Sequence, residues 1–252
     1  MEITLEKLLK GKSTKINEKD FLSTADYVKS FIDATSKLTS TYRIEAIPPR
    51  QLTTDGNNTD LTYNRVLIQA VLPNKVDKYN EILALTYALD VRKPWYKVYR
   101  AFYDNVTNQT FVFNPDWIIV NELKPLEPIE IDINVLLSWT NDFQVKLNTC
   151  KTETLSTKVE SRCFRLGEWI EKCHFDYYNH EINGKVKWSP ANIIKVYNSI
   201  YIDQNAEYYV GDKDSSVINT YQAFADIIAK DQKDIGNRFE KTILINRLLN
   251  IK

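Results

Sequence analysis

The feature that most constrains the fold is a run of β-favouring sequence in the middle of the chain, WYKVYRAFYDNVTNQTFVFNPDWIIVNEL, at residues 95–123. Aromatic and β-branched residues dominate its apolar stretches, and DNVTNQ and NPD interrupt it with turn-forming residues. Apolar runs separated by such short turns predict three consecutive antiparallel strands. A chain that contains this stretch therefore has to be built around a sheet.

The flanking sequence completes the predicted architecture. TYRIEAI (41–47) and YNRVLIQAVLP (63–73) read as strands, whereas VDKYNEILALTYALD (76–90) fits either a helix or a strand. Residues 1–39 and 126–252 show mainly helical spacing, and SPANIIKVYNSIY begins with Ser189 as an N-cap and Pro190 at the first helical position. We predict an α+β fold, with an antiparallel β-meander over about 40–124 packed by N-terminal and C-terminal helices, in one compact domain spanning 1–252.

Composition excludes several classes of function. Only 6 of 252 residues are glycine, and no Gly-rich phosphate-binding motif occurs. The 33 basic residues balance the 33 acidic residues, which argues against a dedicated duplex-DNA binder. The sequence has no signal-peptide pattern, no apolar run long enough to cross a membrane, and an odd number of cysteines, 3. These features predict a cytoplasmic protein without a membrane partner.

One stretch resembles a nuclease signature. PDWIIVNELK matches the PD…ExK pattern of metal-dependent nucleases through Asp116, Glu122 and Lys124. If these residues lie on one extended strand, the two carboxylates are about 20 Å apart, too far to share a metal ion. A metal-dependent nuclease is therefore only the second alternative, and the plainer interpretation gives Asp116 to a turn and Glu122 to a strand end.

The cysteine and histidine residues form a cluster along the chain. Cys150, Cys163, Cys173, His174 and His180 fall within a short segment, but none of the close pairs typical of zinc modules is present. Cys163 and Cys173 would be about 15 Å apart on a continuous helix. The sequence therefore predicts no metal, no cofactor and no catalytic residue here, and an enzyme ranks below a binding protein.

The strongest site signal is RKPWYKVYRAFY, the basic–aromatic stretch at residues 92–103. On a strand, alternate side chains point to opposite faces, and here both faces mix cations with aromatic rings. Single-stranded nucleic acid is held by this combination, because rings stack on bases and cations contact phosphates. The predicted nucleic-acid-binding residues are Arg92, Lys93, Trp95, Lys97, Tyr99 and Arg100.

The basic–aromatic stretch and the function of the whole protein each have an alternative interpretation. Tyr and Trp also favour ordinary strands, where long cations can extend to water, so the basic–aromatic stretch can be a purely structural strand. The leading function is a non-enzymatic protein that binds single-stranded nucleic acid. The first alternative is a protein-binding module, such as an inhibitor of a host defence system or a virion component.

YRAFYDNVTNQTFVFNPDWIIVNELKP together with FEKTILINRLL resembles uncharacterised proteins encoded by tailed phages and plasmids. In these proteins a β-rich half is followed by helices, and the resemblance covers about residues 60–250. It rests on aromatic and turn residues, so no catalytic residue is transferred. It implies a phage or mobile-element origin and action inside a bacterial host cell. The partner expected from the functions above is single-stranded nucleic acid or, for a protein-binding module, a host or phage protein.

Overall fold

The computed structural model describes most of the chain. The described residues are 14–16, 19–47, 65–88, 94–113, 118–132, 134, 142–155, 159–172, 177–179, 184–186, 188–211, 213–230 and 235–251. Every structural statement below refers to these residues.

The described chain folds around one antiparallel sheet. Its strands are β3 (Tyr42–Ile47), β4 (Arg65–Val76), β5 (Tyr79–Ala88), β6 (Trp95–Asp104), β7 (Gln109–Phe111) and β8 (Ile118–Glu122). The hydrogen-bonded order is β3-β4-β5-β6-β7, and β8 also pairs with β6. Together with the helices on both sides, this sheet confirms the predicted α+β fold.

The last two strands share the outer edge of β6. β7 pairs with residues 102–104 of β6, and β8 pairs with residues 95–99. The three strands are consecutive and antiparallel as predicted, but β8 returns to β6 and does not extend the sheet beyond β7. Because β7 is only three residues long, it leaves the first half of the β6 edge free for β8.

The ambiguous segment forms β5. All ten of its residues are buried, because β4 and β6 flank it and both faces of the sheet are covered. A strand buried on both faces loses the alternation of apolar and polar residues that identifies a strand from sequence. This double burial explains why its spacing also fitted a helix.

Helices make up most of the remainder. They are α2 (Thr24–Thr35), α4 (Asp142–Thr152), α5 (Val159–Lys172), α6 (Pro190–Tyr201), α7 (Val217–Lys230) and α8 (Arg238–Leu248), with the 3₁₀ helix η2 (Ile235–Asn237) before α8. Ser189 caps α6 as predicted, since its side chain accepts a hydrogen bond from the backbone N–H of Asn192. Residues 1–13, at the start of the stretch predicted to be mainly helical, lie outside the described residues.

Three short two-stranded pairs accompany the main sheet. They are β1 (Thr14–Ile16) with β2 (Lys19–Phe21), β9 (Thr154–Leu155) with β12 (Ser215–Ser216), and β10 (Tyr177–Asn179) with β11 (Gly184–Val186). β1 and β2 lie within residues 1–39, the stretch predicted to be mainly helical, and α2 begins only after β2. Ser23 fixes that start through a capping box with Asp26.

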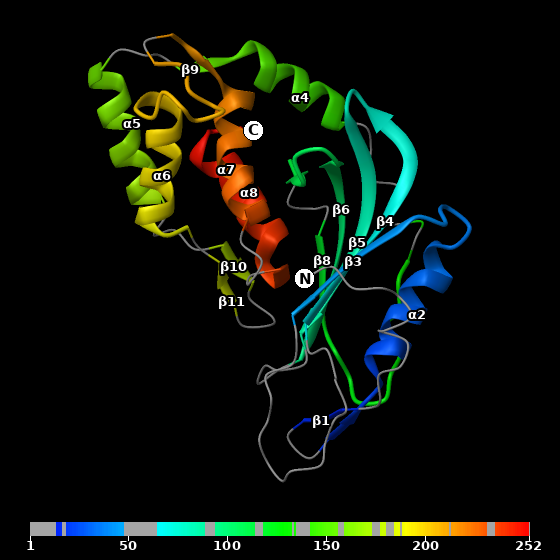
Figure 1. Cartoon of the computed structure of the whole chain (residues 1–252). Helices are drawn as coiled ribbons and strands as arrows, with labels where there is room; N and C mark the ends of the chain where they lie inside the picture. The colour runs from blue at the N-terminus through cyan, green and yellow to red at the C-terminus, as the bar shows by residue number, and fades with distance from the viewer. Residues whose placement is uncertain are drawn as a thin grey trace.

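The sheet separates two apolar cores (Figure 1). On one face α2 packs Tyr27, Val28 and Phe31 against the strands. On the other face α7 and α8 cover the sheet, and α5 and α6 lie farther out from it (Figure 1). β6 is therefore an interior strand, with helices on both sides.

Candidate functional site

The basic–aromatic stretch lies mostly inside the protein. Trp95, Lys97, Tyr99 and Arg100 all belong to β6, and their exposed fractions are only 9%, 5%, 0% and 7%. Arg92 and Lys93 lie outside the described residues. The structure thus brings four of the six predicted binding residues together, but on a covered strand.

Lys97 is matched by an acid from the last helix. Its Nζ donates to Oε1 of Glu240, which lies in the first turn of α8 and is fully buried. The ammonium also sits 4.2 Å from the ring centroid of Trp95. Tyr99 donates its hydroxyl to the other carboxylate oxygen of Glu240 at 3.1 Å, and its ring stacks on Phe239 with centroids 3.9 Å apart. Two residues of the stretch, Lys97 and Tyr99, therefore bind the start of α8, and Trp95 packs against the ammonium of Lys97.

Arg100 is neutralised on the neighbouring strand. Its guanidinium donates to Oε1 of Glu81 in β5, and both side chains are buried. Asn74 donates to the second oxygen of Glu81 at 3.1 Å. The positive charge of Arg100 is therefore paired within the protein, as is that of Lys97.

A second ion pair between α8 and the sheet involves β3, the edge strand at the other end of the strand order from β7. Arg238, the first residue of α8, makes a two-pronged contact with Glu45 in β3, at 2.7 and 2.9 Å. Burial opposes ionisation of Glu45, but the hydrogen bonds and charge of Arg238 outweigh it and lower the pKa of Glu45 below its ordinary 4.5. Paired hydrogen bonds of this kind are stronger and more directional than single ones.

The two ion pairs lie at the ends of one row across four strands. In register, Glu45 faces Leu67, Leu67 faces Thr86, and Thr86 faces Lys97. Strand spacing puts the ends of this row about 14 Å apart. Arg238 and Glu240 are two positions apart on a helix, so they point to opposite sides of α8 and reach opposite ends of the row. The charges thereby fix where α8 sits on the sheet.

Sequence reasoning missed these partners because they are distant in the chain. Lys97 and Glu240 are separated by 143 residues, and Arg238 and Glu45 by 193. The only sequence feature that could have pointed to them is RFE, residues 238–240, where two opposite charges flank a phenylalanine at the beginning of a predicted helix. That pattern is equally typical of a solvated helix end, so it could not identify the pairing.

The nuclease alternative gains no assembled site. Glu122 and Lys124 lie at the exposed end of β8, where Lys124 pairs with Glu127 at 3.2 Å. Asp116 lies outside the described residues. This alternative remains a prediction of the sequence.

The cysteine and histidine cluster is only partly described. Cys150 is buried in α4 and Cys163 is exposed on α5, and burial raises the pKa of Cys150 to about 11. Cys173, His174 and His180 lie outside the described residues. Among the residues with described positions, no group of three His, Cys, Asp or Glu side chains could hold a metal ion.

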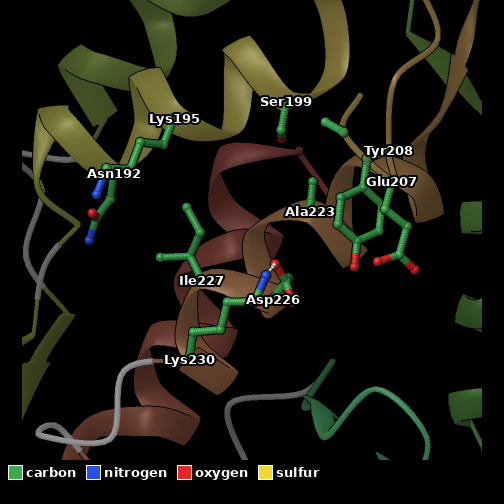
Figure 2. Close-up of a pocket in the computed structure, with 10 residues that line it drawn as sticks. Asn192, Lys195, Ser199, Glu207, Tyr208, Ala223, Asp226, Ile227 and Lys230 are labelled. Atoms are coloured by element: carbon green, nitrogen blue, oxygen red, sulfur yellow. Dashed lines mark hydrogen bonds and ion pairs between the residues drawn. The ribbon is translucent and has the colours of Figure 1, made fainter. Parts of the chain in front are cut away.

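A surface pocket of about 490 Å³ opens between α6 and α7 (Figure 2). α6 contributes Asn192, Lys195 and Ser199, and α7 contributes Asp226 and Lys230, which form an ion pair at 2.6 Å. The loop after α6 closes one end with Glu207 and Tyr208. A pocket of this size can hold a small ligand or a short peptide segment.

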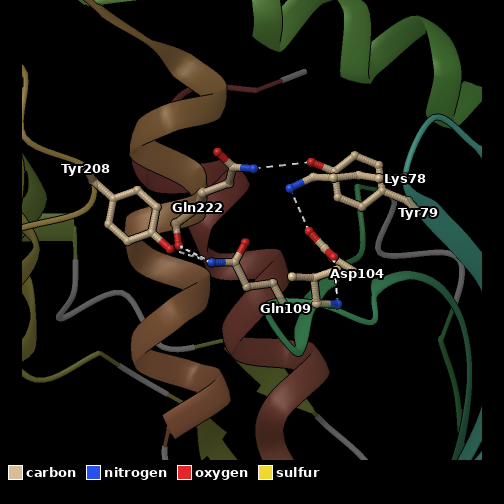
Figure 3. Close-up of polar contacts among 7 residues, drawn as sticks. Lys78, Tyr79, Asp104, Gln109, Tyr208 and Gln222 are labelled. Atoms are coloured by element: carbon tan, nitrogen blue, oxygen red, sulfur yellow. Dashed lines mark hydrogen bonds and ion pairs between the residues drawn. The ribbon is translucent and has the colours of Figure 1, made fainter.

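Hydrogen bonds from the sheet hold the Tyr208 wall of this pocket (Figure 3). Gln109 of β7 donates to the Tyr208 hydroxyl at 2.7 Å and to the carbonyl of Gln222 at 3.2 Å. Gln222 in turn donates to the hydroxyl of Tyr79 at 3.3 Å. Burial, with the charges of Asp226 and Glu207, raises the pKa of Tyr208, so its hydroxyl stays protonated. This network positions the pocket wall independently of any ligand.

Of the seven large apolar side chains that are exposed among the described residues, four belong to α5, α6 and the loop after α6. Phe164 of α5 is 70% exposed and Ile202, at the end of α6, is 62% exposed. Ile194 of α6 and Tyr209 in the following loop are also exposed. We call Phe164, Ile194, Ile202 and Tyr209 the outer helical face.

Polar contacts join the elements of the outer helical face. Arg165 of α5 donates to the hydroxyl of Tyr201 in α6 at 2.7 Å, and Arg162 donates to the carbonyl of Gly211 at 3.2 Å. The backbone N–H of Val210 donates to the carbonyl of Ile200 at 2.9 Å, which holds Tyr209 near the end of α6. The face therefore combines exposed apolar groups with Tyr and Arg side chains on a fixed scaffold.

Comparison of the chain with protein-family models, curated proteins and solved structures gave no match. The resemblance to phage and plasmid proteins therefore remains a prediction. Within the described part of the chain, no helix has the length and apolar character needed to cross a bilayer.

Proposed function

We propose that the protein acts by binding another protein through the outer helical face. The observation that carries the proposal is that four of the seven exposed large apolar side chains among the described residues belong to α5, α6 and the following loop. Of the described helices, α5 and α6 lie far from the sheet, beyond α7 and α8 (Figure 1). Apolar and aromatic groups beside Arg are typical of the centres of protein interfaces. The partner expected for such a protein-binding module is a host or phage protein, as for an inhibitor of a host defence enzyme or a virion component.

Internal pairing also favours this proposal over single-strand binding by β6. Lys97 and Arg100 are paired with buried carboxylates, and Trp95 and Tyr99 pack inside. A nucleic-acid strand could stack on these rings only after α8 had moved away, which would leave Glu240 without its cation. Separating such a buried charged pair costs about 3–5 kcal/mol.

Site-specific photo-crosslinking in the producing cell tests the proposal. A photoreactive phenylalanine analogue at position 164 should give a discrete adduct that protease removes and nuclease leaves intact. The matched control places the analogue at position 106, since Val106 is 82% exposed but lies in the turn between β6 and β7. An adduct sensitive to nuclease, or equal adducts from both positions, would overturn the proposal.

A further inference from the structure

The α6–α7 pocket has one end rich in cations and one acidic end. α6 and α7 run antiparallel beside it, since Asn192 and Lys230 line one end while Ser199 and Ala223 lie toward the other. Figure 2 shows Lys195 and Asn192 on one side and Glu207 with Tyr208 on the other. Ser199 lies seven helical steps after Asn192, which sets a length of about 10 Å.

Two charges in this pocket are uncompensated. Lys230 is paired with Asp226, but neither Lys195 nor Glu207 has an ion-pair partner among the residues the structure describes. Both are exposed. An elongated ligand with an anion at one end and a cation at the other would match both charges.

Tyr208 forms a rigid wall at the Glu207 end of the pocket. Its hydroxyl accepts a hydrogen bond from Gln109. Tyr208 is nearly buried, at 8% exposure, and Gln109 is fully buried. Tyr208 is therefore a fixed part of the pocket wall at the Glu207 end, held from behind by the sheet.

We propose that the α6–α7 pocket binds an extended peptide segment of the partner protein, with an acidic side chain at the Lys195 end and a basic side chain at the Glu207 end. An extended chain advances about 3.4 Å per residue, so the two charged residues are three positions apart. Ile227 and Ala223 provide an apolar floor for the residues between them. This inference rests on the proposed function, because the peptide belongs to the protein bound by the neighbouring outer helical face.

Two blocked tetrapeptides test the pocket, acetyl-Asp-Ala-Ala-Lys-amide and acetyl-Lys-Ala-Ala-Lys-amide. Binding is followed by NMR amide shifts of the full chain, including those of Lys195 and Tyr208. We expect the acidic–basic peptide to bind about tenfold more tightly than the all-basic one. Lys195→Glu should reverse the preference, because it makes both ends of the pocket acidic. Lys213→Glu changes the charge identically at an exposed position that does not line the pocket, and should preserve it.

The outcomes separate this inference from the proposed function. Binding of neither peptide, or a preference that Lys195→Glu leaves unchanged, overturns the pocket assignment even if the adduct at position 164 is present. Selective peptide binding without that adduct supports the pocket and removes the outer helical face as the partner surface. A Phe164→Ala variant should bind the acidic–basic peptide as the unaltered protein does.

Discussion

At the scale of single residues, the main finding is that basic residues which the sequence marks as a binding site are paired with buried acids inside the protein. Lys97 contributes its ammonium to Glu240, and Arg100 contributes its guanidinium to Glu81. Buried charges are tolerated when they are paired and hydrogen-bonded, and become very costly when one partner is lost. The effect of substituting these residues should therefore appear in stability.

Lys97→Met should lower the free energy of unfolding by about 3–5 kcal/mol, because it leaves Glu240 buried without its cation. The double variant Lys97→Met with Glu240→Leu should recover most of this loss, since it removes both charges. Urea titration of the free energy measures both effects. Lys124→Met, in an exposed ion pair, is the matched control and should change stability by less than about 0.5 kcal/mol. Equal small losses for Lys97→Met and Lys124→Met would contradict a buried pair.

The Glu45 pair predicts a dependence on pH. The pKa of Glu45 is lowered in the folded protein from its ordinary 4.5, so its ionised form stabilises the fold above that pH. This stabilisation is lost as the pH falls through the lower folded-state value. Glu45→Gln should cost about 2 kcal/mol near neutral pH, the size of a hydrogen bond to a charged group.

This cost should shrink steadily below pH 4.5, where the wild-type carboxyl also becomes neutral. Urea titrations of wild type and Glu45→Gln across the acidic range measure the difference. A constant difference down to about pH 2, well below the ordinary value for Glu, would show that the carboxylate charge has no role.

At the scale of elements, local signals predicted boundaries well where caps and turns are strong. Ser189 and Pro190 mark the start of α6, and DNVTNQ contains the turn from β6 to β7. The sequence could not assign β5, because burial on both faces erases its alternation. It also could not show that β8 pairs with β6, since strand pairing depends on which edge is free.

The N-terminal cap of α2 is a testable element. Ser23 accepts the backbone N–H of Asp26 at 3.2 Å, and the Asp26 carboxylate accepts the Ser23 N–H at 3.1 Å. Ser23→Ala should lower the free energy of unfolding by about 1 kcal/mol. Ser30 is half-buried in the same helix, where its hydroxyl donates to the carbonyl of Asp26 at 3.0 Å, a carbonyl that also belongs to the helix. Ser30→Ala should therefore change the free energy of unfolding by less than about 0.5 kcal/mol. Thermal unfolding of both variants makes the comparison, and an equal response would show that the cap does not hold α2.

At the scale of the whole molecule, the helices divide into a supporting layer and an outer layer. α7 and α8 cover the sheet, whereas α5 and α6 lie beyond them and carry the outer helical face and one wall of the pocket (Figure 1). This arrangement makes β6 a structural strand and places α5 and α6 on the outside of the helical layer. Sequence reasoning recognised that the accessibility of β6 was decisive. The sequence could not show whether β6 is exposed, because its burial depends on Arg238, Phe239 and Glu240 from the far end of the chain.

Lysine reactivity tests the interior position of β6 most directly. The native protein is exposed briefly to an amine-reactive reagent, and the modified positions are quantified by peptide mass spectrometry. Lys97 should remain unmodified while exposed Lys195 reacts, and Lys97 should become reactive only when the protein is unfolded in urea. Modification of Lys97 in the native protein as fast as Lys195 would contradict a buried pair with Glu240, and would return the basic–aromatic stretch to consideration as a binding surface.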